Sequence, residues 1–347
     1  MYPELKDPGF GSFVATLNQG LREFTGCRVD VVRREDGARG LGSYLGMTAR
    51  GVVKSIRERD YDLVHGHYIG VASGVAWTMA QLLRVPLILT AHGSDVESAQ
   101  APATRLIQKQ VYRQCGGLHF VSESLRARAE HLLGSWSAPT LVAPTGVDLG
   151  IFSPEGLKHS ARQGRQRILM VGQTVEHKGW QEGIQALALL RQSGVDVELV
   201  ALGGPRTDWL KSMAERAGVR EALVCEGQVL LADLPAYYRG ADAVVVASHR
   251  EGFGLVGLEA MACGVPVVST GVGGMKSYTT NGVNALVAKV KNPASLTEKL
   301  TWALDDKTLR ETLVAGGLET AQRFSVESSA RKVAEFYETV VGLRSGT

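Results

Sequence analysis

The chain has 347 residues, of which 44% are hydrophobic and 21% are charged, and its 38 basic and 35 acidic side chains leave a formal net charge of +3. This composition is typical of a folded globular protein and excludes a disordered, collagen-like or coiled-coil chain. No block of five like charges occurs, so a nucleic-acid-binding tail is not expected. At about 150 residues per domain, the length predicts two domains.

The first half of the chain alternates short apolar runs with helical stretches. The apolar runs predict buried parallel strands at residues 29–32, 63–65, 87–90, 118–121 and 141–143. The stretches between them predict helices at residues 13–24, 48–58, 72–83, 103–115 and 124–133. This rhythm predicts a doubly wound parallel sheet with helices on both faces.

One mainly apolar stretch, residues 69–91, is long enough to span a membrane. Its strongly polar side chains are Gln81 and Arg84, and Arg84 lies close to Pro86. The residues from Pro86 onward predict a separate short strand. We therefore expect a buried helix followed by a buried strand instead of a membrane span.

The alternation stops near Gly146 and restarts after a segment rich in Gly, Ser, Pro and charge. We assign residues 1–150 to a first domain, 151–167 to a linker, 168–325 to a second domain and 326–347 to a last helix that packs back toward the first domain. The second domain has predicted strands at 168–171, 197–202, 223–225, 243–247, 266–269 and 285–287 and predicted helices at 180–192, 208–217, 234–238 and 255–263, with a helical remainder after Pro293. Ligands bind beyond the carboxyl ends of such strands, so two facing edges would form an interdomain cleft.

The densest group of candidate functional residues follows the predicted strand that ends near Ser248. Gly252 and Gly254 allow close backbone approach to a ligand, and the helix start at Leu255 favours a phosphate. Glu251 and Glu259 are eight residues apart, roughly 12 Å along a helix. They can hold two ends of one ligand but are too far apart to share a proton. The alternative is a solvated turn glutamate and a glutamate on a helix surface.

The cysteines and histidines give weaker signals. Four distant cysteines without a C-x-x-C pair exclude a disulfide framework and a structural zinc site, and predict reduced thiols. His65, His67 and His92 suggest zinc by type, but no carboxylate or Cys is spaced to complete the site, so strand-end histidines are the simpler interpretation. The sequence also lacks the fingerprints of dinucleotide oxidoreductases, P-loop NTPases, α/β-hydrolases and zincins.

Glu251-Gly-Phe-Gly, followed by Glu259-Ala-Met-Ala-x-Gly-Val-Pro-Val-Val, resembles the E-x7-E signature of the retaining family 4 glycosyltransferases. Residues 171–179 resemble the diphosphate-binding loop of that family. Further similar segments occur in the expected order at residues 61–67, 90–95, 238–243, 273–274 and 281–287. The resemblance covers nearly the whole chain.

The resemblance implies roles for individual residues. Lys178 would pair with the diphosphate of a nucleotide sugar, Glu259 with ribose hydroxyls, and Glu251 with the transferred sugar. His92 would contact the donor sugar or the acceptor. The implied catalytic residues are Glu251, His92 and Lys178, and the implied donor-binding residues are Gly11, Gln173, Lys178, Glu251, Gly252, Phe253, Gly254, Leu255, Val256 and Glu259. By residue type alone, Lys178 could be a solvated turn lysine and His92 a hydrogen-bonded strand-end histidine.

The resemblance further implies an α/β fold of two facing Rossmann-like domains, the GT-B arrangement. The implied reaction transfers a hexosyl or N-acetylhexosaminyl unit from a nucleoside diphosphate sugar to a glycan or lipid-linked acceptor with retention, in cell-surface polysaccharide or glycoconjugate synthesis. Neither a cofactor nor a metal is expected, and no nucleic acid partner. A cytoplasmic location is expected, with peripheral contact to the inner membrane face through Arg50, Lys54, Arg57 and Arg59, although neighbouring Glu58 and Asp60 favour a solvated helix.

Three alternatives remain open. A nucleotide-sugar hydrolase or epimerase would use a similar cleft and release nucleoside diphosphate without an acceptor. A catalytically weak sugar-nucleotide-binding subunit would bind without turnover. A Rossmann-type oxidoreductase is disfavoured by the absent glycine fingerprint.

The sequence departs from the family pattern in three places. Gln173 stands where the family usually has Arg, which removes one cation from the diphosphate site. After Gly273-Gly274 the chain continues Met275-Lys276-Ser277 instead of toward an acidic residue, and Lys276 could supply the charge that Gln173 lacks. The family's first buried strand is missing ahead of the Gly9–Gly11 loop, and a start codon assigned too far downstream is the simplest explanation.

Overall fold

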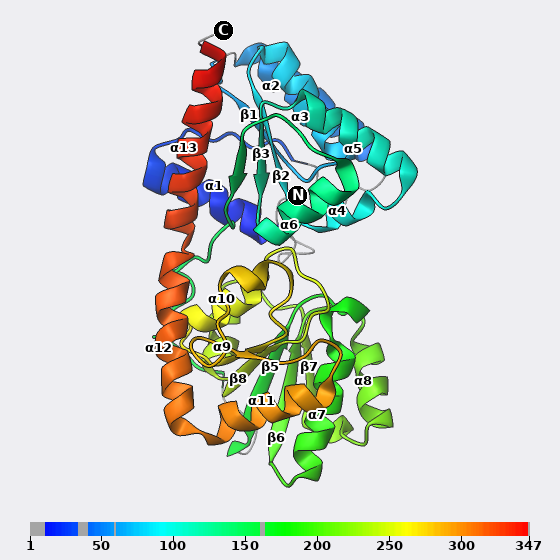
Figure 1. The fold of residues 1–347 in the computed structure, drawn as a ribbon, viewed down its shortest axis with the longest axis vertical. Coiled ribbons are helices and arrows are strands. Elements are labelled where there is room, and N and C mark those ends of the chain that lie inside the picture. The colour runs from blue at the N-terminus through cyan, green and yellow to red at the C-terminus, as the bar shows by residue number, and fades with distance from the viewer. Residues whose placement is uncertain (1–10, 34–40, 59, 160–163, 346–347) are drawn as a thin grey trace. The chain divides into compact units, whose positions relative to one another are not determined.

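The computed structural model describes residues 11–33, 41–58, 60–159 and 164–345 (Figure 1). The chain forms two compact units: unit 1 comprises Met1–Gly146 and Val326–Thr347, and unit 2 comprises Val147–Ser325. Among the described helices, none combines the length and the apolar character needed to cross a bilayer.

Unit 1 is built on a parallel sheet with the strand order β1-β2-β3-β4. Its strands are β1 (Val64–His67), β2 (Leu87–Ala91), β3 (Gly117–Phe120) and β4 (Thr140–Val142). Its helices are α1 (Ser12–Thr25), α2 (Leu41–Arg57), α3 (Val71–Leu83), α4 (Ser94–Ser98), α5 (Pro102–Gln114), α6 (Glu123–Leu133) and α13 (Val326–Ser345). β2 is buried along its whole length, as expected for a strand with neighbours on both sides and helices on both faces.

The predicted strand at residues 29–32 is wrong. α1 ends at Thr25, residues 26–33 contain no strand, and β1 is the edge of the described sheet on that side. An isolated extended segment does not become a strand, because a parallel strand needs a neighbour for its backbone N–H and C=O groups. The first strand that the sequence analysis expects ahead of the given residues is not tested by the structure and stays a prediction.

The last helix, α13, belongs to the core of unit 1. Its Ala330 and Val333 pack against Leu17 and Leu21 of α1, and both pairs are fully buried. Farther along, Phe336 and Val340 form a second apolar cluster with Ile88 of β2. Figure 1 shows α13 beside α1. Two separated parts of the sequence are therefore needed to complete this unit.

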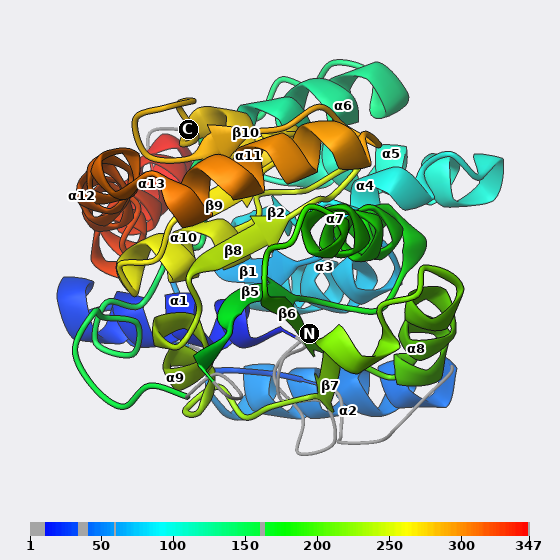
Figure 2. The same ribbon diagram turned by 90° about the horizontal axis from the view of Figure 1, so that it is seen from below.

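Unit 2 has a six-stranded parallel sheet with the order β10-β9-β8-β5-β6-β7. Its strands are β5 (Gln166–Val171), β6 (Val197–Leu202), β7 (Leu223–Gly227), β8 (Ala243–Val246), β9 (Val267–Ser269) and β10 (Leu286–Val287). Its helices are η2 (Glu176–Lys178), α7 (Trp180–Gln192), α8 (Thr207–Arg216), η3 (Arg220–Ala222), α9 (Leu234–Arg239), α10 (Leu255–Ala262), η4 (Gly273–Ser277), α11 (Pro293–Asp305) and α12 (Lys307–Arg323). Helices α7 and α11 lie on one face of the sheet and α9 and α10 on the other (Figure 2).

The start of unit 2, including part of the predicted linker, packs onto the rest of that unit. Val147 forms an isolated parallel bridge with Ser325. The ring of Phe152 lies 5.9 Å from that of Tyr238. The Arg239 guanidinium donates to the backbone carbonyl of Leu157 at 2.8 Å. The segment between the two sheets is thus held by side chains of α9.

A buried ion pair joins β5 to β6 in unit 2. Arg167 Nη2 lies 2.7 Å from Glu198 Oε1, and the two side chains are only 3% and 2% exposed. Replacing Glu198 with Gln leaves the guanidinium without its counter-charge, so we expect a loss of about 3–5 kcal/mol in the free energy of unfolding. Urea unfolding of the variant and the wild type measures this loss. The control is Glu221→Gln, because Glu221 is 63% exposed and should cost less than about 0.5 kcal/mol. Equal unfolding midpoints for the two variants would contradict the prediction.

Candidate functional site

The most distinctive cluster of polar side chains lies at the switch point of the unit 2 sheet. The first strand, β5, pairs with β6 on one side and with β8 on the other. The strand order therefore reverses at β5. At such a switch point the connections on the two sides leave a crevice at the carboxyl ends of the strands. The loops after β5 and β8 carry Lys178 and Glu251 to this edge. The backbone N–H of His249 donates to the carbonyl of His177 at 2.8 Å and ties the two loops together.

Lys178 and Glu251 contact each other directly. Lys178 Nζ donates to Glu251 Oε1 at 2.6 Å, and Ser248 Oγ donates to the same oxygen at 2.7 Å. The two charged side chains are 24% and 11% exposed, so the pair is partly shielded but reachable. This arrangement offers an ammonium group for a phosphate oxygen and a carboxylate for sugar hydroxyls. It excludes the alternative of a freely solvated turn lysine.

Glycines hold the Glu251 loop in place by close backbone contacts. A Cβ atom at Gly273 would lie 1.9 Å from the carbonyl oxygen of Glu251, and one at Gly274 would lie 2.5 Å from that of Gly252. On the other loop, a Cβ atom at Gly179 would lie 2.1 Å from the carbonyl oxygen of Ala247. The side chain of Glu251 is therefore positioned by backbone packing that only glycine permits.

Helix α10 begins directly after the Glu251 loop. Gly254 takes the left-handed conformation at its N-cap, with φ 90°, and its carbonyl accepts a hydrogen bond from Tyr278 Oη at 2.5 Å. Phe253 is buried, whereas Leu255 and Val256 are half-buried at the start of the helix. The first N–H groups of a helix have no partner within it and attract anions. The predicted backbone contacts of this segment to sugar and phosphate stay a prediction.

Glu259 lies one turn into α10 and has a different partner. Tyr238 Oη donates to Glu259 Oε2 at 2.6 Å. Burial raises the pKa of Glu259 to about 7, although the tyrosine hydrogen bond opposes the shift. Glu251 and Glu259 are thus held by separate groups, consistent with two carboxylates that act at different points of a ligand.

The raised pKa of Glu259 predicts that unit 2 loses stability as the pH rises. Between about pH 4.5 and pH 7 the unfolded chain ionises Glu259 while the folded chain keeps it protonated. The free energy of unfolding should therefore fall by about 1–3 kcal/mol across this window, relative to Glu259→Gln. Urea unfolding of both proteins at pH 4.5 and pH 7.5 measures this, with the exposed Glu215→Gln as control. Parallel pH profiles for wild type and Glu259→Gln would contradict it.

The residues that depart from the family pattern lie near this site. Gln173 follows Gly172 in the loop after β5, and its side chain is exposed while its carbonyl accepts the Trp180 indole N–H at 2.9 Å. Lys276 is exposed on η4. The replacement of one charge by the other stays a prediction.

Sequence reasoning missed several contacts. Tyr238 and Ser248 were part of recognised segments, but their hydrogen bonds to Glu259 and Glu251 were not predicted. His249 Nε2 lies 3.0 Å from Glu182 Oε1 of α7, which anchors the loop from its other side. In the sequence, only the position of His249 between the end of a predicted strand and Glu251 indicates that it belongs to the site. Its partner on α7 could be found only from the fold.

In unit 1, the predicted residues Gly11 and His92 lie at the carboxyl edge of the sheet. Gly11 is the N-cap of α1, with φ 80°. The ring of His92 lies 4.9 Å from that of Phe13 at the start of α1, and 4.6 Å from that of Tyr68. Asp95 fixes the turn, since its carboxylate accepts the backbone N–H groups of His92 and Gly93 at 3.1 and 2.8 Å.

His92 is one end of a histidine cluster. Its Nε2 lies 3.1 Å from Nδ1 of His67, whose ring stacks on that of His65, and His65 Nε2 lies 2.5 Å from Thr90 Oγ1. Burial lowers the pKa of His65 to about 3 and that of His119 to about 4, so these rings are neutral. In the described part of the chain, no group of three His, Cys, Asp or Glu side chains is arranged to hold a metal ion. Hydrogen-bonded, neutral histidines account for the H-x-H pattern.

Two parallel α/β units, one of them with a lysine and glutamates at its switch point, are typical of proteins that bind phosphorylated ligands at the carboxyl ends of the strands. Residues 157–320 match the family described as glycosyl transferases group 1, and residues 2–146 match a glycosyl transferase 4-like domain. The chain is 32% identical over 313 residues to D-inositol 3-phosphate glycosyltransferase from Arthrobacter sp. (strain FB24), covering 83% of this chain and 74% of that relative. The chain therefore belongs to the group 1 glycosyltransferases.

Solved structures agree on the fold. The chain is similar to sucrose-phosphate synthase from Thermosynechococcus elongatus, with a TM-score of 0.77 at 20% identity over 91% of this chain and 82% of that one. It is also similar to Anabaena Alr3699/HepE in complex with UDP and glucose, with a TM-score of 0.75 at 22% identity over 92% of this chain and 89% of that one. The fold is the two-domain α/β fold of the GT-B type.

Proposed function

We propose that this glycosyltransferase moves a hexosyl or N-acetylhexosaminyl unit from a nucleoside diphosphate sugar to a glycan or lipid-linked acceptor, with retention of anomeric configuration. The observation that supports it best is the Lys178–Glu251 pair at the switch point, directly beside the start of α10. A cation and free helix N–H groups suit a diphosphate, and the carboxylate beside them suits sugar hydroxyls.

The reaction needs charge stabilisation on the departing diphosphate. Lys178 would give up its contact with Glu251 for a phosphate oxygen, and the first N–H groups of α10 would bind another. Glu251, released from the lysine, would then accept hydrogen bonds from the transferred sugar. Glu259, with Tyr238, would accept from ribose hydroxyls. These groups neutralise the leaving group without a metal, and the acceptor hydroxyl would attack from the face that the diphosphate leaves.

The relatives add a further acceptor class to the glycan and lipid-linked acceptors. The relatives named D-inositol 3-phosphate glycosyltransferase transfer to a phosphorylated cyclitol. That compound is therefore included beside glycan and lipid-linked acceptors. Synthesis of cell-surface polysaccharide or glycoconjugates is the setting we propose.

A cytoplasmic site of action with peripheral membrane contact belongs to the same proposal. The basic face of α2 contributes little to it, because Lys54 already pairs with Glu58 at 3.1 Å and Asp30 at 3.6 Å. Arg59 lies outside the described residues. Co-sedimentation with anionic vesicles at two salt concentrations tests this contact.

The experiment is a donor screen followed by product analysis. UDP-, GDP-, ADP- and TDP-sugars are incubated with each acceptor class in the presence of EDTA, and released nucleoside diphosphate is measured. Acceptor-dependent release, with an anomeric proton coupling in the product that matches the donor, supports the proposal. Release without any acceptor supports a hydrolase or epimerase, and binding without release supports a non-catalytic subunit. Inversion of the anomeric centre would overturn retention.

A further inference from the structure

The loop after β8 contacts the first turn of α7 through a partly buried pair of side chains, His249 and Glu182. Nε2 of His249 lies 3.0 Å from Oε1 of Glu182, and the two side chains are 15% and 13% exposed. An ionised carboxylate only accepts hydrogen bonds, so Nε2 of His249 carries the hydrogen of this contact. Because Nε2 can carry a hydrogen in a neutral and in a protonated ring, the pair needs a donor but not a charge on His249.

Glu182 depends on His249 for its hydrogen bond. The second carboxylate oxygen, Oε2, is buried and has no hydrogen-bond partner among the described residues. The carboxylate lies near the N-terminus of α7, where the helix dipole favours a negative charge. Removing the His249 donor would leave a largely buried carboxylate without this hydrogen bond, which is costly. The two side chains therefore hold each other in place.

His249 links the same region a second time through its backbone. Its N–H donates to the carbonyl of His177 at 2.8 Å. His177 directly precedes Lys178, and His249 lies two residues before Glu251. The loop that carries Glu251 is thus fixed at one residue to the Lys178 loop and to α7, separately from the Lys178–Glu251 contact.

Donor binding would affect these links differently. In the proposed reaction, Lys178 gives up Glu251 for a phosphate oxygen, so the contact at 2.6 Å is lost. The hydrogen bond from Ser248 to Glu251 remains, but both residues belong to the same loop and cannot fix it to the Lys178 loop. The two hydrogen bonds of His249 use neither Lys178 nor Glu251. They can therefore keep the two loops together after the exchange.

We propose that Glu182 and His249 are positioning residues for the transfer reaction: they hold the loop of Glu251 against the loop of Lys178 while Lys178 binds the diphosphate. This inference rests on the proposed function, because the exchange of partners by Lys178 is a step of it. The reaction requires the Glu251 carboxylate at the sugar and the Lys178 ammonium group at the diphosphate at the same time. A displacement of about 1 Å at such a group can lower a rate about 100-fold.

The first test needs no substrate. Lys178→Ala removes the Lys178–Glu251 contact in the absence of a ligand, and hydrogen exchange is followed at the amide of His249, with β6 as internal reference. In the Lys178→Ala background, we expect Glu182→Ala to speed this exchange at least tenfold, because both side-chain links are then removed. In the wild-type background the effect should be at most threefold. Equal effects of Glu182→Ala in the two backgrounds would overturn the proposal.

Two variants of unit 2 serve as controls. Glu182→Gln retains an acceptor oxygen for the imidazole N–H and should exchange like its parent in both backgrounds. Asp196→Asn breaks an ion pair with Arg191 at 3.0 Å, directly before β6 and therefore at the amino edge of the same sheet. It should have no effect at the monitored amide. The same acceleration from Asp196→Asn as from Glu182→Ala would mean a general loosening of unit 2 and would contradict a specific role of the pair.

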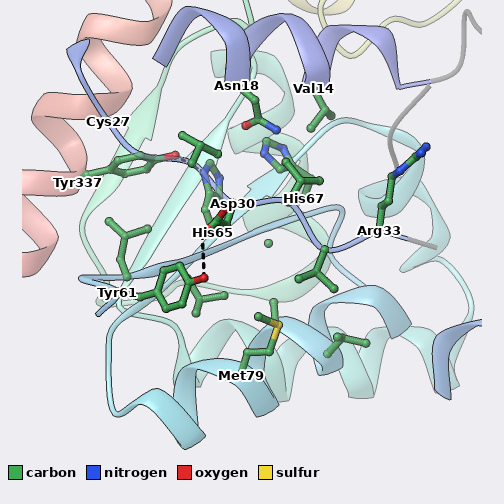
Figure 3. A pocket seen from close by; sticks show the side chains of 18 of the residues that line it. Val14, Asn18, Cys27, Asp30, Arg33, Tyr61, His65, His67, Met79 and Tyr337 are labelled. Atoms are coloured by element: carbon green, nitrogen blue, oxygen red, sulfur yellow. Dashed lines mark hydrogen bonds between the residues drawn. The ribbon is translucent and has the colours of Figure 1, made fainter. Parts of the chain in front are cut away.

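A third control lies in unit 1. Tyr61 Oη donates to Asp30 Oδ2 at 2.8 Å beside a cavity of about 720 Å³ (Figure 3). Tyr61→Phe removes this hydrogen bond and should leave exchange at the His249 amide unchanged. Acceleration by Tyr61→Phe would show that this amide responds to any lost side-chain hydrogen bond, and the proposal would be wrong.

The second test uses the transfer reaction. His249→Ala should lower kcat at least fivefold, whereas His249→Gln, whose side-chain amide also carries N–H groups, should stay within twofold of wild type. The dissociation constant of the released nucleoside diphosphate should change less than twofold in both variants, because Lys178 and the start of α10 are intact. Weaker binding in proportion to kcat would indicate a merely structural role and would count against the proposal.

A double variant shows whether His249 acts through Glu251. In the Glu251→Gln background, His249→Ala should lower kcat less than twofold further. Full additivity of the two effects would overturn the proposal, as would wild-type kcat in His249→Ala. The proposed function fails separately: in that case the wild-type chain shows no acceptor-dependent transfer, and the exchange experiment still decides whether the Glu182–His249 pair holds the loop.

Discussion

Replacing Lys178 with Ala, or Glu251 with Gln, should lower the turnover number for glycosyl transfer at least tenfold while the fold stays intact. The Lys178→Ala variant lacks the positive charge that would stabilise the departing diphosphate. The Glu251→Gln variant lacks a charged acceptor for sugar hydroxyls. Charge-assisted contacts of this kind contribute about 2–4 kcal/mol to the transition state. Steady-state kinetics with the donor and acceptor found in the screen measure the effect.

The matched control for this pair lies on α8. Lys211 and Asp208 form an ion pair at 3.2 Å, and their side chains are 38% and 95% exposed. Lys211→Ala and Asp208→Asn should leave turnover unchanged. Because Lys178 and Glu251 contact each other, the double variant should lose less than the sum of the single effects. Near wild-type turnover in both single variants would show that the site is misassigned.

Gly273→Ala should abolish most of the activity without touching a charged group. The new Cβ atom would lie 1.9 Å from the Glu251 carbonyl oxygen, so the Glu251 loop must move. The backbone of Gly273 also has φ +61°, which costs alanine about 1–2 kcal/mol. We expect at least a tenfold loss in kcat/KM, measured beside the melting temperature.

Gly282→Ala separates the two causes. Gly282 has φ +76°, but a Cβ atom there would meet nothing within 4 Å. It should therefore show the conformational cost alone, a few degrees in melting temperature, with normal kcat/KM. Loss of activity in both variants to the same extent would mean that backbone strain, not displacement of Glu251, is responsible.

Much of the fold could be predicted from the sequence because buried parallel strands give continuous apolar runs. Residues 197–202 and 180–192 were predicted with the bounds that β6 and α7 have. α2 begins at Leu41 instead of residue 48, because Gly42 and Gly46 weaken the helical pattern there. The predicted strand at residues 29–32 is wrong for another reason: its apolar pattern is present, but no strand among the described residues pairs with it.

The candidate site was predicted in part. The glycine turn, Lys178 and both glutamates stand out in the sequence, because they belong to contiguous motifs. The direct contact between Lys178 and Glu251 did not, since 73 residues separate them. Only the pairing of β5 with β8 brings the two loops together. The tyrosine that holds Glu259 was hidden for the same reason.

The placement of α13 has a consequence for how the chain folds during synthesis. Residues 147–325 form a continuous unit and can fold as soon as they leave the ribosome. Unit 1 cannot complete its core at that stage. Leu17 and Leu21 of α1 pack against Ala330 and Val333, which are made more than 300 residues later. The part made first therefore keeps an apolar face of α1 exposed until the residues of α13 have been made, and exposed apolar surface of this kind favours aggregation.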